Sequence, residues 1–169
     1  MTTLQELEKR IERLEELEKR VQAIEELEAI KKLHRDYVYW MSNHQWEDMI
    51  HCFAEDAVTE MSNMGEQKGK KAIEEFFKNQ ISKQEAFQKG GHMLIQPVIS
   101  VDGDKAVGYW TMYRFTYDFQ SPAGEIVQLF GPELQGKFDC EYVKENGKWK
   151  FGKMKFIRPW PEISHKENV

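Results

Sequence analysis

The sequence predicts an α+β fold in which a strongly curved, cone-shaped antiparallel sheet and three helices enclose a hydrophobic cavity, preceded by a long helical extension. Two observations lead to this prediction. Residues 6–35 repeat a helical pattern of ten residues that contains no Gly or Pro and none of the chain's 5 Trp, 6 Tyr and 10 Phe side chains. After Gly91, long runs of alternating apolar and polar residues are separated by turn sequences, as in antiparallel strands.

The composition excludes several classes of protein. With 169 residues and a net charge of −5, the chain has the size of one domain. It has neither a membrane-length apolar run nor the apolar core of a signal peptide, so we expect a cytoplasmic protein with no membrane partner. The pI near 5.6 disfavours nucleic acid as the main partner. Cys52 and Cys140 lie far apart without a C-x-x-C motif, which favours buried thiols over a disulfide or a zinc site.

The N-terminal repeat occurs as ELEKRIERLE (6–15), ELEKRVQAIE (16–25) and a decayed ELEAIKKLHR (26–35). Its apolar residues recur every three or four positions, and Glu often lies four residues before Arg or Lys, which indicates a helix. A period of ten gives about 3.33 residues per turn, so the apolar stripe rotates by roughly 80° per repeat on a straight helix. The first and last repeats must therefore face different surroundings.

This rotation suggests a division of the chain. We expect residues 1–23 to be a charged helical extension that packs on a partner subunit, residues 24–161 to be the domain, and residues 162–169 to be a polar tail. A solvated, frayed helix is the alternative for the extension.

Three helices are expected around one early strand. The first, at residues 24–43, continues the apolar spacing of the repeat, and a short second helix is expected at residues 45–53. The third, at residues 69–82, carries Ile73 and two phenylalanines on one side. The early strand is expected at residues 57–62.

Four long strands are expected in the second half of the chain, at residues 92–101, 105–119, 125–143 and 148–158. Asp102-Gly103-Asp104 and Asn146-Gly147 predict hairpin turns, and Gly131-Pro132 predicts a bend or bulge within the third of these strands.

The strand at residues 105–119 is largely apolar on both faces near its start. Trp110 lies on one face and Tyr113 on the other. Helices covering one face and another subunit covering the other would explain this pattern, so we expect a homo-oligomer, a dimer or trimer, through the outer sheet face and the N-terminal helix.

Three segments carry a family resemblance: AIKKLHRDYVYWMSNHQWEDMIHCFAEDAV (29–58), the Gly-Gly-His of residues 90–92, and NGKWKFGKMKFIRPW (146–160). Over roughly residues 24–160 the chain resembles the SnoaL-like branch of the nuclear transport factor 2-like (cystatin-like) superfamily. It is most similar to bile-acid 7α-dehydratases, and more distantly similar to scytalone dehydratase and the lindane dehydrochlorinase.

The resemblance implies a set of site residues. In those enzymes a cavity histidine removes a proton, a tyrosine near the end of the first helix assists, and an aspartate orients the histidine. His92 and Tyr37 match the first two, and Arg158 matches a cavity arginine of the bile-acid enzymes. The sequence departs from the pattern at two acids, because Ser42 replaces the orienting aspartate and a second acid falls at about Arg114.

Each candidate also has a structural alternative. His92 could be a buried strand histidine, Tyr37 a core tyrosine bonded to a backbone carbonyl, and Arg158 half of an ion pair at the rim. Pro97 interrupts the alternation around His92, so the face to which His92 points stays open. Trp110, Tyr113 and Ser42 are further candidates for contact with a ligand.

No cofactor is expected, because the chain has no Walker loop, dinucleotide glycine motif or G-x-S-x-G. His44, Asp48 and His51 would share a helical face, but no obvious fourth ligand accompanies them, so no metal is expected either.

Two functions remain. The first is a cofactor-independent lyase (a dehydratase) or isomerase for a hydrophobic, ring-containing carbonyl compound, steroid-like or polyketide-like, with His92 as base. The second is a non-catalytic small-molecule-binding or assembly module of the same fold.

Overall fold

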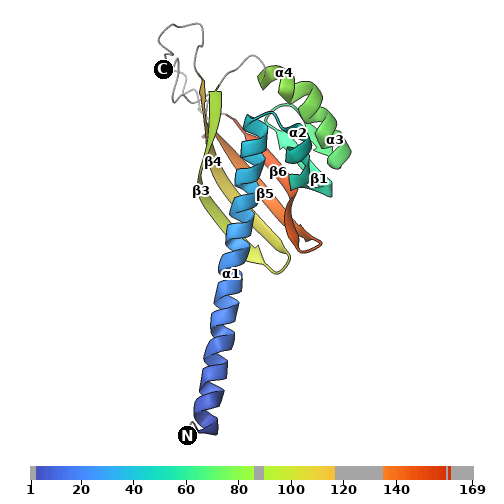
Figure 1. Cartoon of the computed structure of the whole chain (residues 1–169). Coiled ribbons are helices and arrows are strands. Elements are labelled where there is room, and N and C mark those ends of the chain that lie inside the picture. Colours follow the sequence, from blue (N-terminus) through green and yellow to red (C-terminus); the bar gives the residue numbers. More distant parts are fainter. Residues whose placement is uncertain (1–2, 86–89, 117–134, 159, 161–169) are drawn as a thin grey trace, which may run out of the picture.

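A curved six-stranded sheet wraps around the second half of helix α1 (Leu4–Ser42) in the computed structural model (Figure 1). The structure describes residues 3–85, 90–116, 135–158 and 160. The expected bend at Gly131-Pro132, and the parts of the expected strands between residues 117 and 134, lie outside these ranges. After α1 follow α2 (Trp46–Met49), the 3-10 turn η1 (Ile50–Cys52), β1 (Phe53–Met61), β2 (Glu66–Lys68), α3 (Lys70–Phe76), the π-helical turn η2 (Phe77–Ile81), α4 (Ser82–Glu85), β3 (Gly90–Asp102), β4 (Lys105–Thr116), β5 (Gln135–Glu145) and β6 (Lys148–Ile157).

The strand order is β2-β1-β6-β5-β4-β3. All neighbouring pairs are antiparallel except β1 and β6, which run parallel. The predicted α+β fold with a curved sheet is confirmed, but the expectation of a purely antiparallel sheet was wrong at this pair. The chain crosses the whole sheet between β1 and β3 and then returns strand by strand, so β6 reaches β1 running in the same direction.

Both predicted hairpin turns are present. Asn146 and Gly147 have φ angles of 52° and 74°, the left-handed pair that a two-residue type I′ turn requires. Gly103 joins β3 to β4 with a φ of 57°. Within β3, Gln96 has a φ of 53° and the pairing with β4 shifts between Ile95 and Val98, so a bulge interrupts the alternation.

The helical segments differ from the predictions in detail. The expected third helix is split into α3, η2 and α4, and the second ends in a 3-10 turn. β1 begins at Phe53, earlier than the expected residue 57, because buried Phe53 and Ala54 belong to the strand. Exposed Glu55 and Asp56 lie at an irregularity in the pairing with β6, which hides the strand period in the sequence.

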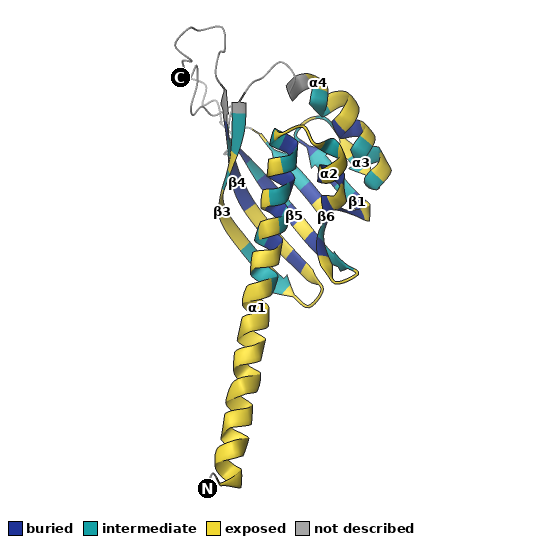
Figure 2. Cartoon of the chain, viewed as in Figure 1, coloured by how far each residue is buried: buried dark blue, intermediate teal, exposed yellow. Residues whose placement is uncertain are grey.

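The second half of α1 packs on the inner face of the sheet through one apolar stripe. Its buried residues recur every three or four positions, and Figure 2 shows this half of the helix over the buried parts of the sheet. The rings of His34 and Tyr37 contact aromatic side chains of β4, β5 and β6. The stripe consists of Ile30, His34, Tyr37, Val38 and Met41.

A polar network lies inside this core. Trp110 Nε1 donates to the Tyr142 hydroxyl at 2.8 Å, and that hydroxyl lies 3.0 Å from His34 Nδ1. The Tyr142 hydroxyl has one proton and a second lone pair besides the one that accepts from Trp110, so the direction of its hydrogen bond with Nδ1 is set by the tautomer of the His34 ring. Burial lowers the pKa of His34 to about 3, so the ring stays neutral at physiological pH.

Glu26 fixes α1 to the end of the sheet. Its carboxylate accepts hydrogen bonds from Lys144 Nζ and Trp149 Nε1, both at 2.5 Å. Lys144 is the main cause that lowers the pKa of this carboxyl below its ordinary value. Residues 4–25, which we call the arm, precede this attachment and are exposed throughout (Figure 2).

The arm starts with a complete capping box. The Thr3 side chain accepts from the Glu6 backbone N–H, and the Glu6 carboxylate accepts from the Thr3 backbone N–H. Although α1 is 39 residues long, neither it nor any other helix in the described ranges has the apolar stretch that a membrane crossing requires.

The outer face of the sheet is apolar at its β3 and β4 side. Large side chains there are exposed to solvent, and lysines and acids follow on β5 and β6. The exposed apolar group comprises Met93, Ile95, Val98, Val107 and Tyr109.

Candidate active site

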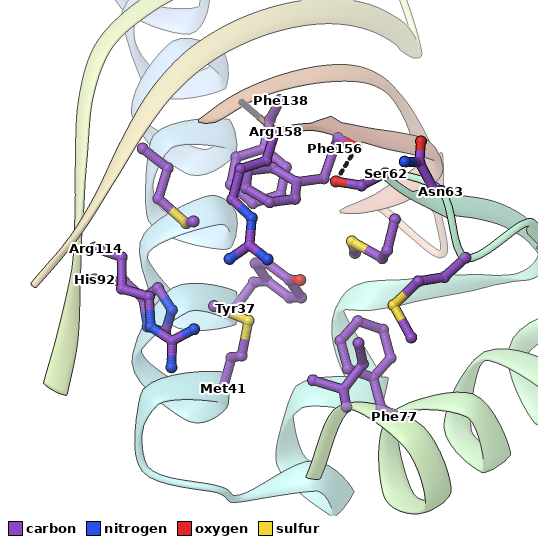
Figure 3. Close-up of a pocket in the computed structure, with 14 residues that line it drawn as sticks. Tyr37, Met41, Ser62, Asn63, Phe77, His92, Arg114, Phe138, Phe156 and Arg158 are labelled. Atoms are coloured by element: carbon purple, nitrogen blue, oxygen red, sulfur yellow. Dashed lines mark hydrogen bonds between the residues drawn. The ribbon is translucent and has the colours of Figure 1, made fainter. Parts of the chain in front are cut away.

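A cavity of about 300 Å³ lies between α1, the turn after β1, η2 and the inner face of the sheet (Figure 3). Its volume is at the small end of the range for ligand sites. The lining is mainly apolar and includes four methionines, whose flexible side chains adapt to the shape of a ligand. The lining residues are Tyr37, Met41, Met61, Ser62, Asn63, Met64, Phe77, Ile81, His92, Met112, Arg114, Phe138, Phe156 and Arg158.

Tyr37 comes from the buried stripe of α1. Its ring is fully buried, with edge contacts to Phe138 at 6.1 Å and Phe151 at 5.4 Å between ring centroids. Packing on two sides holds the ring in one orientation, and Figure 3 shows it between Arg158 and Met41.

His92 lies on β3 directly opposite Arg114 of β4, and both side chains line the cavity. It precedes the bulge at Gln96, so the uninterrupted alternation from Gly90 to Ile95 determines its face. His92 Nδ1 is 2.9 Å from Ser42 Oγ, a contact between β3 and the last residue of α1. Ser42 therefore stands where an orienting group is needed, but its hydroxyl supplies no negative charge.

The surroundings of His92 favour the neutral ring. Its pKa is lowered to about 4, mainly by burial and further by the positive charges of Arg114 and Arg158. At neutral pH the ring is therefore unprotonated, but it is a weaker base than an exposed histidine.

Arg158 follows β6 and lies at the rim of the cavity, exposed to solvent. Figure 3 shows its guanidinium group directed into the cavity, toward Tyr37. The rim ion pair considered as an alternative is absent from the part of the chain that the structure describes. None of the described lining residues is an aspartate or glutamate, so the formal charges of the lining are those of the two arginines.

The structure thus brings together three of the sequence-predicted residues, Tyr37, His92 and Arg158, in one cavity. Ser42 reaches the site through its contact with His92. Trp110 is buried in the polar network of the core and Tyr113 lies on the opposite face of β4, and neither is among the lining residues.

Sequence reasoning missed most of the apolar lining. The turn after β1 contributes Ser62, Asn63 and Met64, and no local pattern distinguishes such a turn from an exposed one. Arg114 was noted only as a departure from the family pattern. It lies four residues after Trp110 on the same strand, so the two side chains lie on the same face, and the sequence already indicated this.

His44, Asp48 and His51 do not form a metal site. Within the described ranges, no three His, Cys, Asp or Glu side chains converge in a way that could hold a metal ion. The His44 ring instead stacks on Trp46, with 5.5 Å between centroids.

Gly136 controls the position of one cavity wall. A Cβ atom at this residue would lie 2.3 Å from the ring of Phe156, which lines the cavity. Gly136→Ala is therefore expected to displace that ring and to destabilise the fold by about 1–3 kcal/mol, measured by denaturant unfolding. Gly152→Ala is the matched control, because its nearest contact is the Val143 side chain at 3.1 Å. Equal stability of Gly136→Ala and the native chain would contradict this account.

Comparisons with known proteins agree with this architecture. The family described as SnoaL-like domain matches residues 22–155. A search of curated protein sequences finds no significant match.

Solved structures with similar folds share little sequence with this chain. A nuclear transport factor 2-like protein with a cystatin-like fold, from Novosphingobium aromaticivorans, is 16% identical, with a TM-score of 0.71 over 96% of this chain and 94% of the other. A hexachlorocyclohexane dehydrochlorinase of LinA type 3, from Novosphingobium barchaimii, is 16% identical, with a TM-score of 0.65 over 88% and 97%. A protein of unknown function with a cystatin-like fold, from Nostoc punctiforme, is 17% identical, with a TM-score of 0.62 over 76% and 87%. At these identities the likeness concerns the fold, and the similarity to bile-acid 7α-dehydratases stays a prediction.

Proposed function

We propose that this chain, which belongs to the family of SnoaL-like domains, is a cofactor-independent lyase or isomerase for a hydrophobic, ring-containing carbonyl compound. The main support is that Tyr37, His92 and Arg158, from three different elements, line one largely apolar cavity. The dehydrochlorinase among the structures of similar fold adds support, because it too is named for an elimination.

In the proposed reaction His92 removes a proton from the carbon next to the substrate carbonyl. The base form requires the Nδ1–H group to donate to Ser42 Oγ, so that the lone pair lies on Nε2. The electrons of the broken C–H bond move to the carbonyl oxygen, where Tyr37 donates a hydrogen bond and Arg158 stabilises the negative charge. A lyase then expels a hydroxyl group from the neighbouring carbon with the proton from His92, and an isomerase returns that proton to another carbon.

Two properties of the cavity favour a polyketide-like substrate over a steroid-like one. A volume of about 300 Å³ suits two or three fused rings better than four. A base with a pKa of about 4 removes a proton efficiently only from a carbon whose C–H is already acidic. Such a carbon lies between two carbonyl groups or between a carbonyl and an aromatic ring.

The alternative is a binding module of the same fold without turnover. The contact of His92 with a hydroxyl group instead of a carboxylate favours it, because Ser42 does not stabilise a charged imidazole.

Hydrogen–deuterium exchange distinguishes the two functions. 2-Tetralone is a suitable probe, because it has two fused rings and an acidic CH₂ between an aromatic ring and a carbonyl. The catalytic proposal expects protein-dependent exchange at that carbon in D₂O, followed by NMR, together with binding in the cavity of a soaked crystal. Binding without exchange above the buffer rate supports the binding module and overturns the catalytic proposal.

We also propose that the chain forms a homo-oligomer in the cytoplasm through the outer sheet face and the N-terminal helix. The exposed apolar residues of β3 and β4 and of the arm support the association. The thiols of Cys52 and Cys140, both free and buried, are compatible with a reducing compartment.

A further inference from the structure

The cavity wall next to His92 carries a buried positive charge. Arg114 of β4 is only 5% exposed, lines the cavity and lies directly opposite His92 of β3. A guanidinium group keeps its charge at physiological pH, and a buried charge is costly unless negative or hydrogen-bonding groups surround it. The reaction proposed above uses Arg158 at the rim and gives Arg114 no role.

The cavity is divided into an apolar side and a charged side. Figure 3 shows His92 and Arg114 on one side of the cavity and Phe77 on the other. The guanidinium group of Arg158 also points into the cavity, and none of the described lining residues is an aspartate or glutamate. A ligand that combines apolar rings with an anionic group therefore matches both sides.

We infer that the cavity binds ring compounds that carry a carboxylate group, and that Arg114 holds this carboxylate. The inference rests on the proposed function, because it adds one substituent to the same substrate and leaves Tyr37 and Arg158 at the carbonyl oxygen. A carboxylate is favoured over other anions because the planar guanidinium group donates two parallel hydrogen bonds to its two oxygens. Arg114 also interacts with other groups of the chain, and its five N–H donors allow a ligand to bind in addition to them.

The place of Arg114 beside the base also favours an anionic ligand. Burial is the main cause that lowers the pKa of His92 to about 4. The positive charges of Arg114 and Arg158, and to a smaller extent that of His44, lower it further. With a neutral substrate Arg114 therefore only weakens the base. A bound carboxylate offsets the arginine charges and raises the pKa of His92, so the substrate supplies the negative charge that Ser42 does not provide.

Binding of matched ring compounds tests the inference on the native chain. 2-Naphthoate has two fused rings and a carboxylate, which suits a cavity of about 300 Å³, and 2-naphthamide has the same shape without the charge. Isothermal titration calorimetry at pH 7 is expected to give a dissociation constant at least about tenfold lower for 2-naphthoate. Equal affinities, or tighter binding of the amide, overturn the inference. 2-Naphthalenesulfonate is expected to bind more weakly than 2-naphthoate because its anionic group is not planar, and equal or tighter binding of the sulfonate overturns the assignment to a carboxylate.

Substitution of Arg114 tests whether this residue holds the carboxylate. Arg114→Gln is expected to raise the dissociation constant of 2-naphthoate at least about tenfold and to leave that of 2-naphthamide within about twofold of the native value. Arg114→Lys keeps the charge without the planar fork, so its affinity for 2-naphthoate should lie between the two. Arg35→Gln is the control, because Arg35 is exposed and is not a lining residue. Circular dichroism identifies the variants that fold, and an unchanged preference for 2-naphthoate in them overturns the role of Arg114.

Two further results separate this inference from the proposed reaction. Exchange of 2-tetralone without a preference for 2-naphthoate keeps the reaction and overturns the carboxylate site, whereas the preference without exchange keeps the site and overturns the reaction. NMR titration of the His92 ring reports on the effect of the bound charge. Saturation with 2-naphthoate is expected to raise the pKa of His92, and saturation with 2-naphthamide is not. The same pKa in both complexes would show that the carboxylate does not lie beside His92 and Arg114.

Discussion

His92→Gln is expected to lower the rate of substrate proton exchange by about 10²–10⁴-fold while leaving the fold intact. Gln retains a polar side chain of similar size at this half-buried position but accepts no proton at physiological pH. The exchange rate of 2-tetralone and the unfolding midpoint are measured together, so that a loss of activity is separated from a loss of structure. His51→Gln is the control, because His51 is exposed and distant from the cavity lining. A rate that survives in His92→Gln would remove His92 from the mechanism.

The pH dependence of the same rate reports on the surroundings of His92. Since protonation removes the base, the rate should rise with pH through the pKa of about 4 and be flat from about pH 5 to pH 8. Arg158→Gln removes a positive charge that lowers this pKa, and Ser42→Asp adds a negative charge beside Nδ1, so both should move the rise to higher pH. A native midpoint near 6.5 would contradict the electrostatic account of the site.

Acid is expected to destabilise the chain through His34, and His34→Gln should remove that part of the effect. The unfolded chain binds a proton at the ordinary pKa of 6.5, whereas the folded chain binds it only near pH 3. His34 therefore stabilises the fold fully above pH 6.5, and its contribution is lost as pH falls toward 3. Between pH 7.5 and pH 5 the loss amounts to about 2 kcal/mol of unfolding free energy.

Denaturant unfolding at the two pH values measures this contribution. His34→Gln keeps both a donor and an acceptor for the Tyr142 hydroxyl but does not titrate, and the carboxylates and His92 are common to both proteins. The difference between the two pH values should therefore be about 2 kcal/mol smaller in His34→Gln than in the native chain or in the His51→Gln control. An equal pH dependence in all three proteins would show that His34 is not buried and neutral in solution.

The fold was largely predictable because its main signals are local. Asn146-Gly147 and Asp102-Gly103-Asp104 determine two of the turns, and the aromatic alternation of β4 separates its inner and outer faces. The parallel pairing of β1 with β6 was not predictable, because it joins segments that lie far apart in the chain. The strand β2 pairs with the neighbouring β1, but its three residues are all polar and too few to show a strand pattern.

The candidate site was predictable only in part. Tyr37 follows from the helical stripe, and its place in the cavity agrees with the family resemblance. The face of His92 was left open because Pro97 signals a break whose exact position, between Ile95 and Val98, the sequence does not specify. The network of His34, Trp110 and Tyr142 joins residues up to 108 positions apart, and no local pattern indicates it.

The unbroken course of α1 joins the exposed arm to the cavity wall in one element. The helix contains no Gly or Pro between Leu4 and Ser42, the residue that contacts His92. Its second half is buried against the sheet, so the packing around the cavity also fixes the direction in which the arm leaves the domain. Anything that binds the arm therefore meets it at a place set by the same residues that build the cavity.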